Sequence, residues 1–320
     1  MELLKNTEKL NKLIGSCESV YIMGHRNLDL DAIASCTAMY EYVKAFNKKP
    51  MIVINDIRHE KGVKKVLEKI KTSYKIVKSS KIKIDNKSLL IIVDTNKEYL
   101  LQDRELFNKV QHILVIDHHD PSDASITKGL VIIDRDTSST CEMITDLLDK
   151  ENIKVDSYTA TLLLSGIVLD TNNYVIKTTE NTFRTSYILT TWGADPRYVQ
   201  SLLKQDIKSY VARQKVITNV KQIKNIAISF AKSDVIYRRE DLAKIADTLL
   251  QFDKIEASFV VGKLENESIG ISARSLGNIN VGKILEEFNG GGDENEAGAA
   301  VENSTIKEVE ERLKEIIKKI

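Results

Sequence analysis

The chain has 320 residues, of which 42% are hydrophobic and 29% charged, and its formal net charge is +1. This composition is ordinary for a folded protein, and a length above the ~100–200 residues of one domain predicts two domains. The balanced charge argues against a general electrostatic grip on long nucleic acid.

The N-terminal half alternates apolar strands with amphipathic helices. Helices are predicted over 3–14, 31–46 and 61–71, and strands over 19–23, 50–54, 89–93, 113–116 and 130–133. Several of these strands are unbroken apolar runs, as expected of strands buried on both faces of a parallel sheet. The pattern predicts an α/β fold with a doubly wound, mostly parallel sheet.

The C-terminal half divides at Gly193-Ala194-Asp195-Pro196, a sequence that breaks a helix. Before it we expect helices over 139–150, 157–169 and 181–192. After it we expect one or two connecting helices, then strands over 225–230, 256–264 and 268–274 and helices over 240–252, 281–288 and 307–320. The sequence therefore predicts a first domain (1–195), a helical linker (196–223) and a smaller α/β domain (224–320).

The cysteines and the apolar runs indicate the cellular compartment in which the protein is expected. Cys17, Cys36 and Cys141 have no metal-type spacing and predict free thiols in a reducing cytoplasm. No apolar run approaches the ~18 residues of a membrane span, and no signal-peptide core precedes the first helix. We expect a cytoplasmic chain, or the cytoplasmic catalytic part of a longer, membrane-anchored protein.

Acidic and imidazole side chains stand where predicted strands and one apolar helical segment end. They are His25, Asp29 and Asp31 after the first strand, Asp94 after 89–93, Asp117-His118-His119 after 113–116, and Asp170 after 162–169. The carboxyl ends of parallel strands meet at one edge of a sheet, so these side chains should converge.

A metal cluster explains four such motifs better than four separate structural roles do. Singly, each motif has an ordinary explanation, such as helix capping in the first loop. Together, the imidazoles and carboxylates suit a divalent ion such as Mn²⁺, and they suffice for two ions about 3.5–4 Å apart. Such a pair activates water near neutral pH and binds phosphoryl oxygens, which is the chemistry of phosphoester or phosphoanhydride hydrolysis.

These motifs, with the stretch GHRNLDLDAI at 24–33, resemble those of the DHH phosphoesterase superfamily. The resemblance covers nearly the whole chain. It implies that two Mn²⁺ ions are bound, with Asp94 as the bridge and His119 near the scissile phosphate. The implied metal ligands are His25, Asp29, Asp31, Asp94, His118 and Asp170, and the implied catalytic residues are Asp94, His118 and His119.

The second domain resembles the DHH-associated domain, which binds the nucleotide part of the substrate. This resemblance rests on SARSLG-x-x-NV at 272–281 and on the glycines at 290–292. Together with MGHR and Thr137–Thr140 in the first domain, these motifs are similar to those of GdpP-type cyclic di-AMP phosphodiesterases. Glycine amides can approach a phosphate closely, and the planar guanidinium of Arg274 offers paired hydrogen-bond donors to a phosphate or a base. The implied substrate-binding residues are Ser272, Arg274, Gly290, Gly291, Gly292, Asp293, Ser138 and Ser139. The two serine hydroxyls either cap a helix or hold a phosphate.

Two positions depart from the family pattern. Asp293 stands where the family usually has His after the glycine triplet. A carboxylate accepts hydrogen bonds and repels a phosphate, so Asp293 must be protonated, bind a third cation, or turn away from the ligand. Leu28 replaces a proline that many relatives carry, which should loosen the loop.

The resemblance implies a Mn²⁺-dependent phosphodiesterase that opens cyclic di-AMP to pApA in a cleft between the domains. Its expected partner is a cyclic dinucleotide or short oligonucleotide, and a homodimer is one possible assembly. The alternatives are a nanoRNase and 3′-phosphoadenosine 5′-phosphate (pAp) phosphatase, or a non-catalytic nucleotide sensor. A family II inorganic pyrophosphatase ranks low because no lysine and arginine cluster lies near Arg274 in the sequence.

Overall fold

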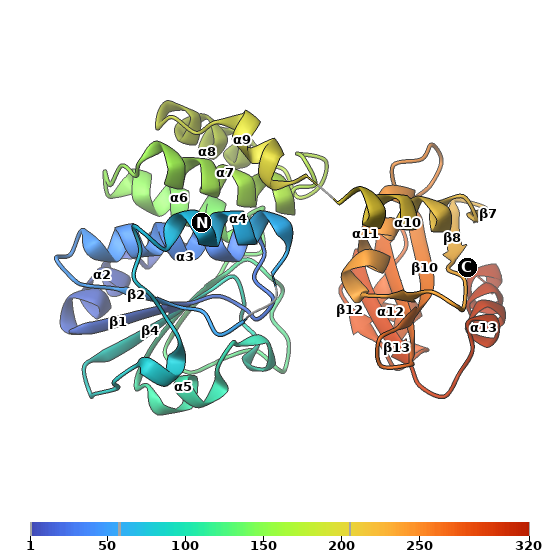
Figure 1. Cartoon of the computed structure of the whole chain (residues 1–320), viewed down its shortest axis with the longest axis horizontal. Coiled ribbons are helices and arrows are strands. Elements are labelled where there is room, and N and C mark those ends of the chain that lie inside the picture. Colours follow the sequence, from blue (N-terminus) through green and yellow to red (C-terminus); the bar gives the residue numbers. More distant parts are fainter. Residues whose placement is uncertain (1, 57–58, 205, 320) are drawn as a thin grey trace. The chain divides into compact units, whose positions relative to one another are not determined.

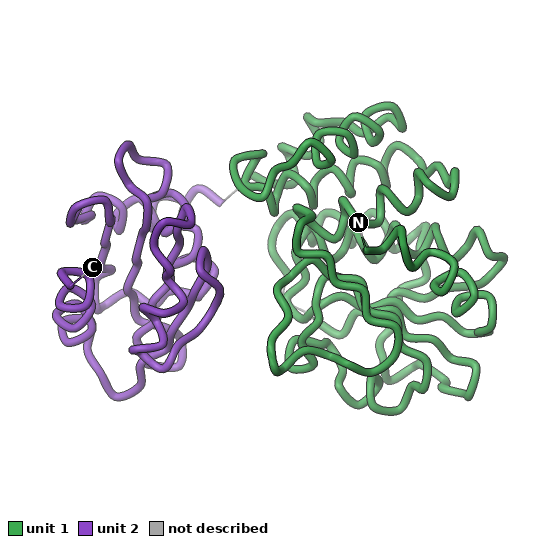
Figure 2. The backbone as a smooth tube through the Cα atoms, turned by 180° about the vertical axis from the view of Figure 1, so that it is seen from behind, with its two compact units in different colours: residues 1–204 green, residues 205–320 purple. Residues whose placement is uncertain are grey.

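The computed structural model describes residues 2–56, 59–204 and 206–319. Its contacts divide the chain into two compact units that separate after Lys204 (Figure 2). The described part of the range 196–223, where one or two helices were expected, contains two. Helix α9 (Pro196–Leu202) packs on α7 (Ser157–Asp170) of unit 1, and α10 (Ile207–Ile217) packs on α11 (Arg239–Leu249) of unit 2.

Unit 1 is built on a six-stranded sheet in which every strand pair is parallel. The strands are β1 (Ser19–Met23), β2 (Met51–Val53), β3 (Ile76–Val77), β4 (Ser88–Val93), β5 (His112–Asp117) and β6 (Leu130–Ile133). Their order is β3-β2-β1-β4-β5-β6, so the chain winds outward in opposite directions from β1 and from β4. The predicted doubly wound α/β fold is confirmed, with the two halves meeting between β1 and β4.

Helices cover both faces of this sheet and then form a further layer (Figure 1). Helices α3 (Leu30–Lys44) and α4 (Lys61–Ile70) lie on one face, and α5 (Arg104–Lys109) lies on the other. Helices α6 (Thr140–Lys150) and α7 pack on α3, with α8 (Glu180–Thr191) and α9 beside them. The N-terminal helices are α1 (Glu2–Lys5) and α2 (Thr7–Ser16), and 3-10 turns span Ser79–Lys81 and Glu98–Leu100.

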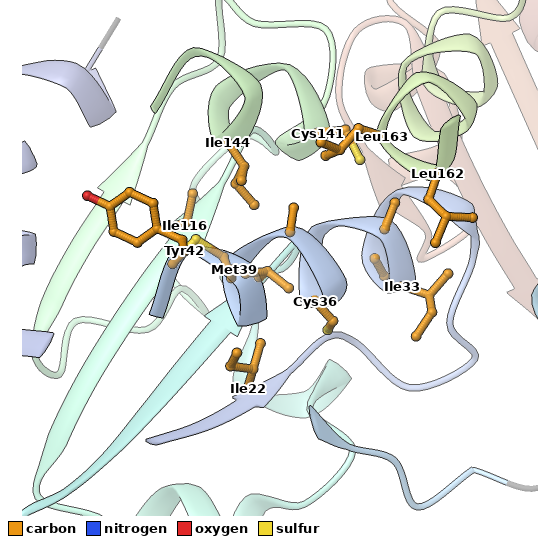
Figure 3. Close-up of a cluster of buried hydrophobic side chains, with 14 of the residues drawn as sticks. Ile22, Ile33, Cys36, Met39, Tyr42, Ile116, Cys141, Ile144, Leu162 and Leu163 are labelled. Carbon is orange, nitrogen blue, oxygen red and sulfur yellow. The ribbon is translucent and has the colours of Figure 1, made fainter. Parts of the chain in front are cut away.

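The core of unit 1 lies between the sheet, α3 and the α6–α7 pair (Figure 3). Helix α3 is buried on nearly all sides because the sheet covers one face and α6 and α7 cover the other. Side chains from all these elements meet there, including Ile22, Ile116, Ile33, Cys36, Met39, Cys141, Ile144, Leu162 and Leu163. The three cysteines are buried free thiols, as the sequence predicts. This packing holds the starts of α3 and α6 and the end of α7 in fixed positions.

Unit 2 is a smaller α/β unit with a seven-stranded mixed sheet. Its order is β12-β13-β11-β10-β8-β7, with β9 also paired to β10. The strands are β7 (Lys221–Ile223), β8 (Ile226–Phe230), β9 (Ile236–Tyr237), β10 (Ala257–Leu264), β11 (Ile269–Ser275), β12 (Gly291–Gly292) and β13 (Glu296–Val301). Helices α10 and α11 share one hydrophobic cluster with the sheet, whereas α12 (Val281–Glu286) and α13 (Ile306–Lys319) share another. Within the described residues, no helix is long and apolar enough to cross a membrane.

Candidate active site

The candidate site lies at the carboxyl ends of β1, β4 and β5, where the strand order reverses. Open α/β sheets bind their ligands at such a switch point. Three overlapping groups of side chains have donor atoms within 4.8 Å of one another, a spacing that could hold a metal ion. The groups are His25, Asp29 and Asp94; Asp31, Asp94, His118 and Asp170; and Asp94, His118 and His119. All six predicted metal ligands are therefore brought together, and Asp94 belongs to every group.

Asp94 stands in the middle of the site, with its two carboxylate oxygens turned toward different imidazoles. Its Oδ2 lies 3.5 Å from His25 Nε2, and its Oδ1 lies 3.6 Å from His118 Nε2. The backbone turns sharply at Asp94, where φ is +62°, a left-handed value that is uncommon for a residue other than glycine. One oxygen facing each ligand group is the arrangement that a bridging carboxylate requires.

The carboxylates of the site crowd one another. Burial, and then the negative charge of Asp31, raises the pKa of Asp94 well above its usual value. Burial, and then the charge of Asp170, raises the pKa of Asp31 to about 6. A divalent cation among these groups would replace this repulsion with attraction.

His118 has the protonation state of a metal ligand. Burial, and then the positive charge of His119, lowers its pKa to about 4, so its imidazole is neutral at pH 7. Both ring nitrogens are buried without a hydrogen-bond partner, and Nε2 lies 3.1 Å from Asp170 Oδ2. A buried polar atom with no partner is rare, and a neutral imidazole nitrogen is a common metal ligand. The residues present therefore fit a divalent cation.

His25 and Asp29 form the wall of the site that follows β1. His25 Nδ1 lies 2.8 Å from the Arg26 carbonyl oxygen, which leaves Nε2 directed at Asp94 and at Asp29 Oδ2, 3.5 Å away. Asp29 is the N-cap of α3, and its Oδ1 accepts from Ala32 N at 2.9 Å. Burial would raise the pKa of Asp29, but the hydrogen bond with His25, the charge of His25 and the bond from Ala32 N together outweigh burial, and the pKa falls to about 2. Capping therefore uses one oxygen of Asp29, and the other oxygen faces His25.

His119 presents a positive charge to solvent at the edge of the site. Its side chain is 51% exposed, and its Nδ1 lies 2.8 Å from Asp117 Oδ1. Burial would lower the pKa of His119, but the hydrogen bond and charge of Asp117 raise it to about 10. Asn96 holds Asp117 in turn, with Nδ2 donating to Asp117 Oδ2 at 2.6 Å. Asn96 was not predicted as a site residue, although its place two residues after Asp94 was a signal.

Ser138 and Ser139 are fully buried at the start of α6. Ser139 is the N-cap, and its Oγ accepts from Glu142 N at 3.1 Å. The Ser138 hydroxyl donates to the carboxylate of Glu142, which also accepts from Asn181 Nδ2 at 2.8 Å. Capping, one of the two roles expected for these hydroxyls, is the role that Ser139 shows, while the Ser138 hydroxyl bonds Glu142. The buried Glu142, which joins α6 to α8, was not anticipated.

A cavity of about 360 Å³ in unit 2 brings together three predicted substrate-binding residues: Ser272, Arg274 and Gly291. Arg274 is already engaged there, since its Nε donates to Asp247 Oδ1 at 2.8 Å and a terminal nitrogen lies 3.5 Å from Glu296 Oε2. The other lining residues include Arg239, Glu240, Glu296 and Gly298, none of which the sequence analysis singled out. Gly290, Gly292 and Asp293 are not among the described residues that line the cavity.

Asp293 directs its carboxylate at its own turn between β12 and β13. Its Oδ1 accepts from the backbone N–H groups of Asn295 at 2.8 Å and Glu296 at 2.7 Å. Turning away was one of the three expectations for a carboxylate at this position. Leu28, the other departure from the family pattern, is buried in the unit 1 core.

Comparison of the sequence with known proteins finds one family domain in each of the two units. The profile of the DHH family N-terminal domain matches residues 19–167, and that of the DHHA1 domain matches residues 214–320. The chain is 35% identical to the cyclic-di-AMP phosphodiesterase GdpP of Bacillus subtilis (strain 168), over 96% of this chain and 49% of that protein. It is 28% identical to the bifunctional oligoribonuclease and PAP phosphatase NrnA of Mycoplasma genitalium, over 73% of this chain and 74% of that protein. The chain thus spans about half the length of GdpP.

Solved structures share the fold. An exopolyphosphatase-related protein from Bacteroides fragilis superimposes with a TM-score of 0.81 at 18% identity, covering 99% of this chain and 96% of that one. The exonuclease RecJ bound to manganese gives a TM-score of 0.55 at 14% identity, covering 100% of this chain and 95% of that one. At these identities the likeness concerns the fold alone.

Proposed function

Because the chain belongs to the DHH family, with a DHHA1 domain after its DHH domain, we propose that it is a metal-dependent phosphodiesterase that hydrolyses cyclic di-AMP to pApA. The observation that carries the proposal is the set of three candidate ligand groups that share Asp94, together with the buried nitrogens of His118, which make no hydrogen bond within the described residues. The choice of substrate is supported by the similarity to GdpP over 96% of the chain.

Two Mn²⁺ ions are the proposed cofactor. His25, Asp29 and Asp94 would hold one ion, while Asp31, Asp94, His118 and Asp170 would hold the other. Mixed imidazole and carboxylate donors suit Mn²⁺, and RecJ, which shares the fold, was crystallised with manganese. When bound, two such ions supply Lewis acidity toward the phosphoryl group and lower the pKa of a water molecule.

The side chains of this protein have separate roles in the reaction. Water adds to one phosphorus of the cyclic dinucleotide, the P–O3′ bond breaks, and the 3′-oxygen takes up a proton, which leaves pApA with a 5′-phosphate. His119, held protonated by Asp117, donates a hydrogen bond to a phosphoryl oxygen and can supply a proton. In unit 2, the cavity at Ser272 and Arg274 accepts the nucleotide part of the substrate, with the guanidinium as a planar donor.

A second candidate function is the degradation of short oligonucleotides and of pAp. The observation that favours it is the 28% identity, over 73% of this chain, to NrnA, a bifunctional oligoribonuclease and PAP phosphatase. A linear dinucleotide offers the site the same phosphodiester group, so the ligand groups alone are equally suited to both substrates.

Turnover of three substrates separates these functions. The full chain is stripped of metal, loaded with Mn²⁺, and given cyclic di-AMP, pApA or pAp, with products followed by liquid chromatography and mass spectrometry. The proposal predicts accumulation of pApA from cyclic di-AMP. Hydrolysis of pApA and pAp without hydrolysis of cyclic di-AMP would favour the second function. Tight binding of all three without turnover would indicate a nucleotide sensor.

A further inference from the structure

The start of helix α6 contacts the candidate site through two of the candidate metal ligands, Asp31 and Asp94. Thr140 N donates to Asp31 Oδ2 at 2.9 Å, and Cys141 N donates to Asp31 Oδ1 at 2.9 Å. All three residues are completely buried, so these bonds form in a low-dielectric environment. The two N–H groups fix the plane of the Asp31 carboxylate, and each oxygen keeps a lone pair for another partner.

Thr140 makes a second contact that links Asp31 to Asp94. Its hydroxyl Oγ1 donates to Asp94 Oδ1 at 3.1 Å. Asp94 Oδ1 is the oxygen that faces His118, on the side of the site where Asp31 and Asp170 lie. One residue therefore holds two candidate ligands, with its backbone N–H on one and its hydroxyl on the other.

Helix α7 prevents Asp31 from moving away from these donors. A Cβ atom at Gly166 would lie 2.7 Å from Asp31 Oδ1 and 2.5 Å from Cys141 Sγ, distances that a real side chain cannot occupy. Only a glycine lets α7 approach this closely. Asp170 follows Gly166 by four residues, on the same face of α7. Asp31 is thus enclosed between α6 and α7, and α7 also supplies Asp170.

We propose that Thr140 is a positioning residue for the metal centre, an inference that rests on the metal-dependent function proposed above. It holds Asp31 and Asp94 in the orientation that the second ion requires, before any ion arrives. Groups that orient metal ligands commonly change metal affinity about 10–100-fold when they are removed. A purely structural threonine at a helix start would instead change folding stability and leave metal binding alone.

Three variants distinguish these roles. Thr140→Val removes the hydroxyl but keeps the size and the backbone N–H, and Thr140→Ser restores the hydroxyl. Thr145→Val is the matched control, because Thr145 lies in the same helix, is also completely buried, and donates its hydroxyl to the Cys141 carbonyl oxygen at 2.7 Å. If Thr140→Val loses its fold by circular dichroism, Thr140→Ala removes the same hydroxyl without placing a methyl group beside Asp94.

The readout is Mn²⁺ binding to the metal-free full chain, measured by calorimetric titration and by electron paramagnetic resonance of the coupled ion pair. The wild type should bind two ions. Thr140→Val should lose about 10–100-fold in affinity for at least one ion and weaken the coupled signal. Thr140→Ser should recover most of that affinity, and Thr145→Val should match the wild type. If the wild type binds two ions and Thr140→Val binds them with the same affinity, the role of Thr140 is wrong while the metal centre stands. If the wild type binds no Mn²⁺, both the metal centre and this inference are wrong.

Discussion

Replacing Asp94 with Asn should change the stability of unit 1 in opposite directions with and without metal. Asn keeps the shape of the side chain and an acceptor for the Thr140 hydroxyl, but it removes the charge that all three ligand groups share. In the metal-free protein, burial and Asp31 raise the Asp94 pKa, so the ionised carboxylate becomes more destabilising as pH rises through that pKa. Above it, the metal-free variant should be at least as stable as the wild type.

Metal should reverse this ranking. A ligand at 100 times its dissociation constant adds about 2.7 kcal/mol per site to the stability of the folded state. For a unit the size of unit 1, each kcal/mol raises the melting temperature by about 2–4 °C. The first Mn²⁺ alone should therefore raise the melting temperature of the wild type by roughly 5–10 °C, and Asp94→Asn should lose most of that increase.

Thermal unfolding with a chelator and then with excess Mn²⁺ measures both effects. Asp156→Asn is the control, because Asp156 caps the other end of α7 from Asp170 and Asn retains the acceptor for Thr159 N. A Mn²⁺ shift in Asp94→Asn equal to that of the wild type would refute the bridging role. So would a metal-free variant clearly less stable than the wild type, since that would make Asp94 a structural residue.

The remaining predictions concern the edge of the site and unit 2. His119 has a folded pKa of about 10 against an ordinary 6.5, so its contribution to stability is complete below about pH 6.5 and is lost as pH rises toward 10. The free energy of unfolding of the metal-free protein, measured by urea titration at a series of pH values in this range, should therefore fall less steeply with pH for His119→Gln than for the wild type. An equal dependence on pH in the two proteins would contradict the pairing of His119 with Asp117. Arg274→Lys should raise KM about tenfold with Mn²⁺ binding unchanged, because an ammonium cannot replace the planar fork in the unit 2 cavity; an unaltered KM would remove Arg274 from the substrate site. Asp293→Ala should lower the free energy of unfolding by about 1 kcal/mol by freeing two backbone N–H groups, and an unchanged midpoint in urea would argue against that turn.

The ends of the long parallel strands were the most predictable part of the molecule. Apolar runs such as the one before Asp94 have a single interpretation in an α/β pattern, and a parallel sheet gathers their carboxyl ends at one edge. Convergence of five of the six predicted ligands followed from that geometry, whereas the sixth, Asp170, lies at the end of helix α7. The short strand β3 was missed because two residues carry no periodicity, and β13 was missed because Glu296–Val301 is rich in alanine and glycine.

Contacts between distant helices could not be read from the sequence. Thr140 lies 109 residues from Asp31 and 46 from Asp94, and it reaches both because α6 packs across α3. The same holds for Gly166, whose missing side chain matters only once α7 lies against Asp31. In unit 2, Arg274 was a plausible phosphate ligand, but its partner Asp247 lies on a helix 27 residues away.

Anomalous diffraction from crystals of the full chain grown with Mn²⁺ tests the central claim most directly. Data collected at the manganese absorption edge should contain two peaks about 3.5–4 Å apart, one beside His25 and Asp29 and the other beside His118 and Asp170, with Asp94 between them. An absence of manganese at these residues in protein saturated with Mn²⁺, or a single ion that leaves the His118 nitrogens unliganded, would contradict the proposed two-metal centre.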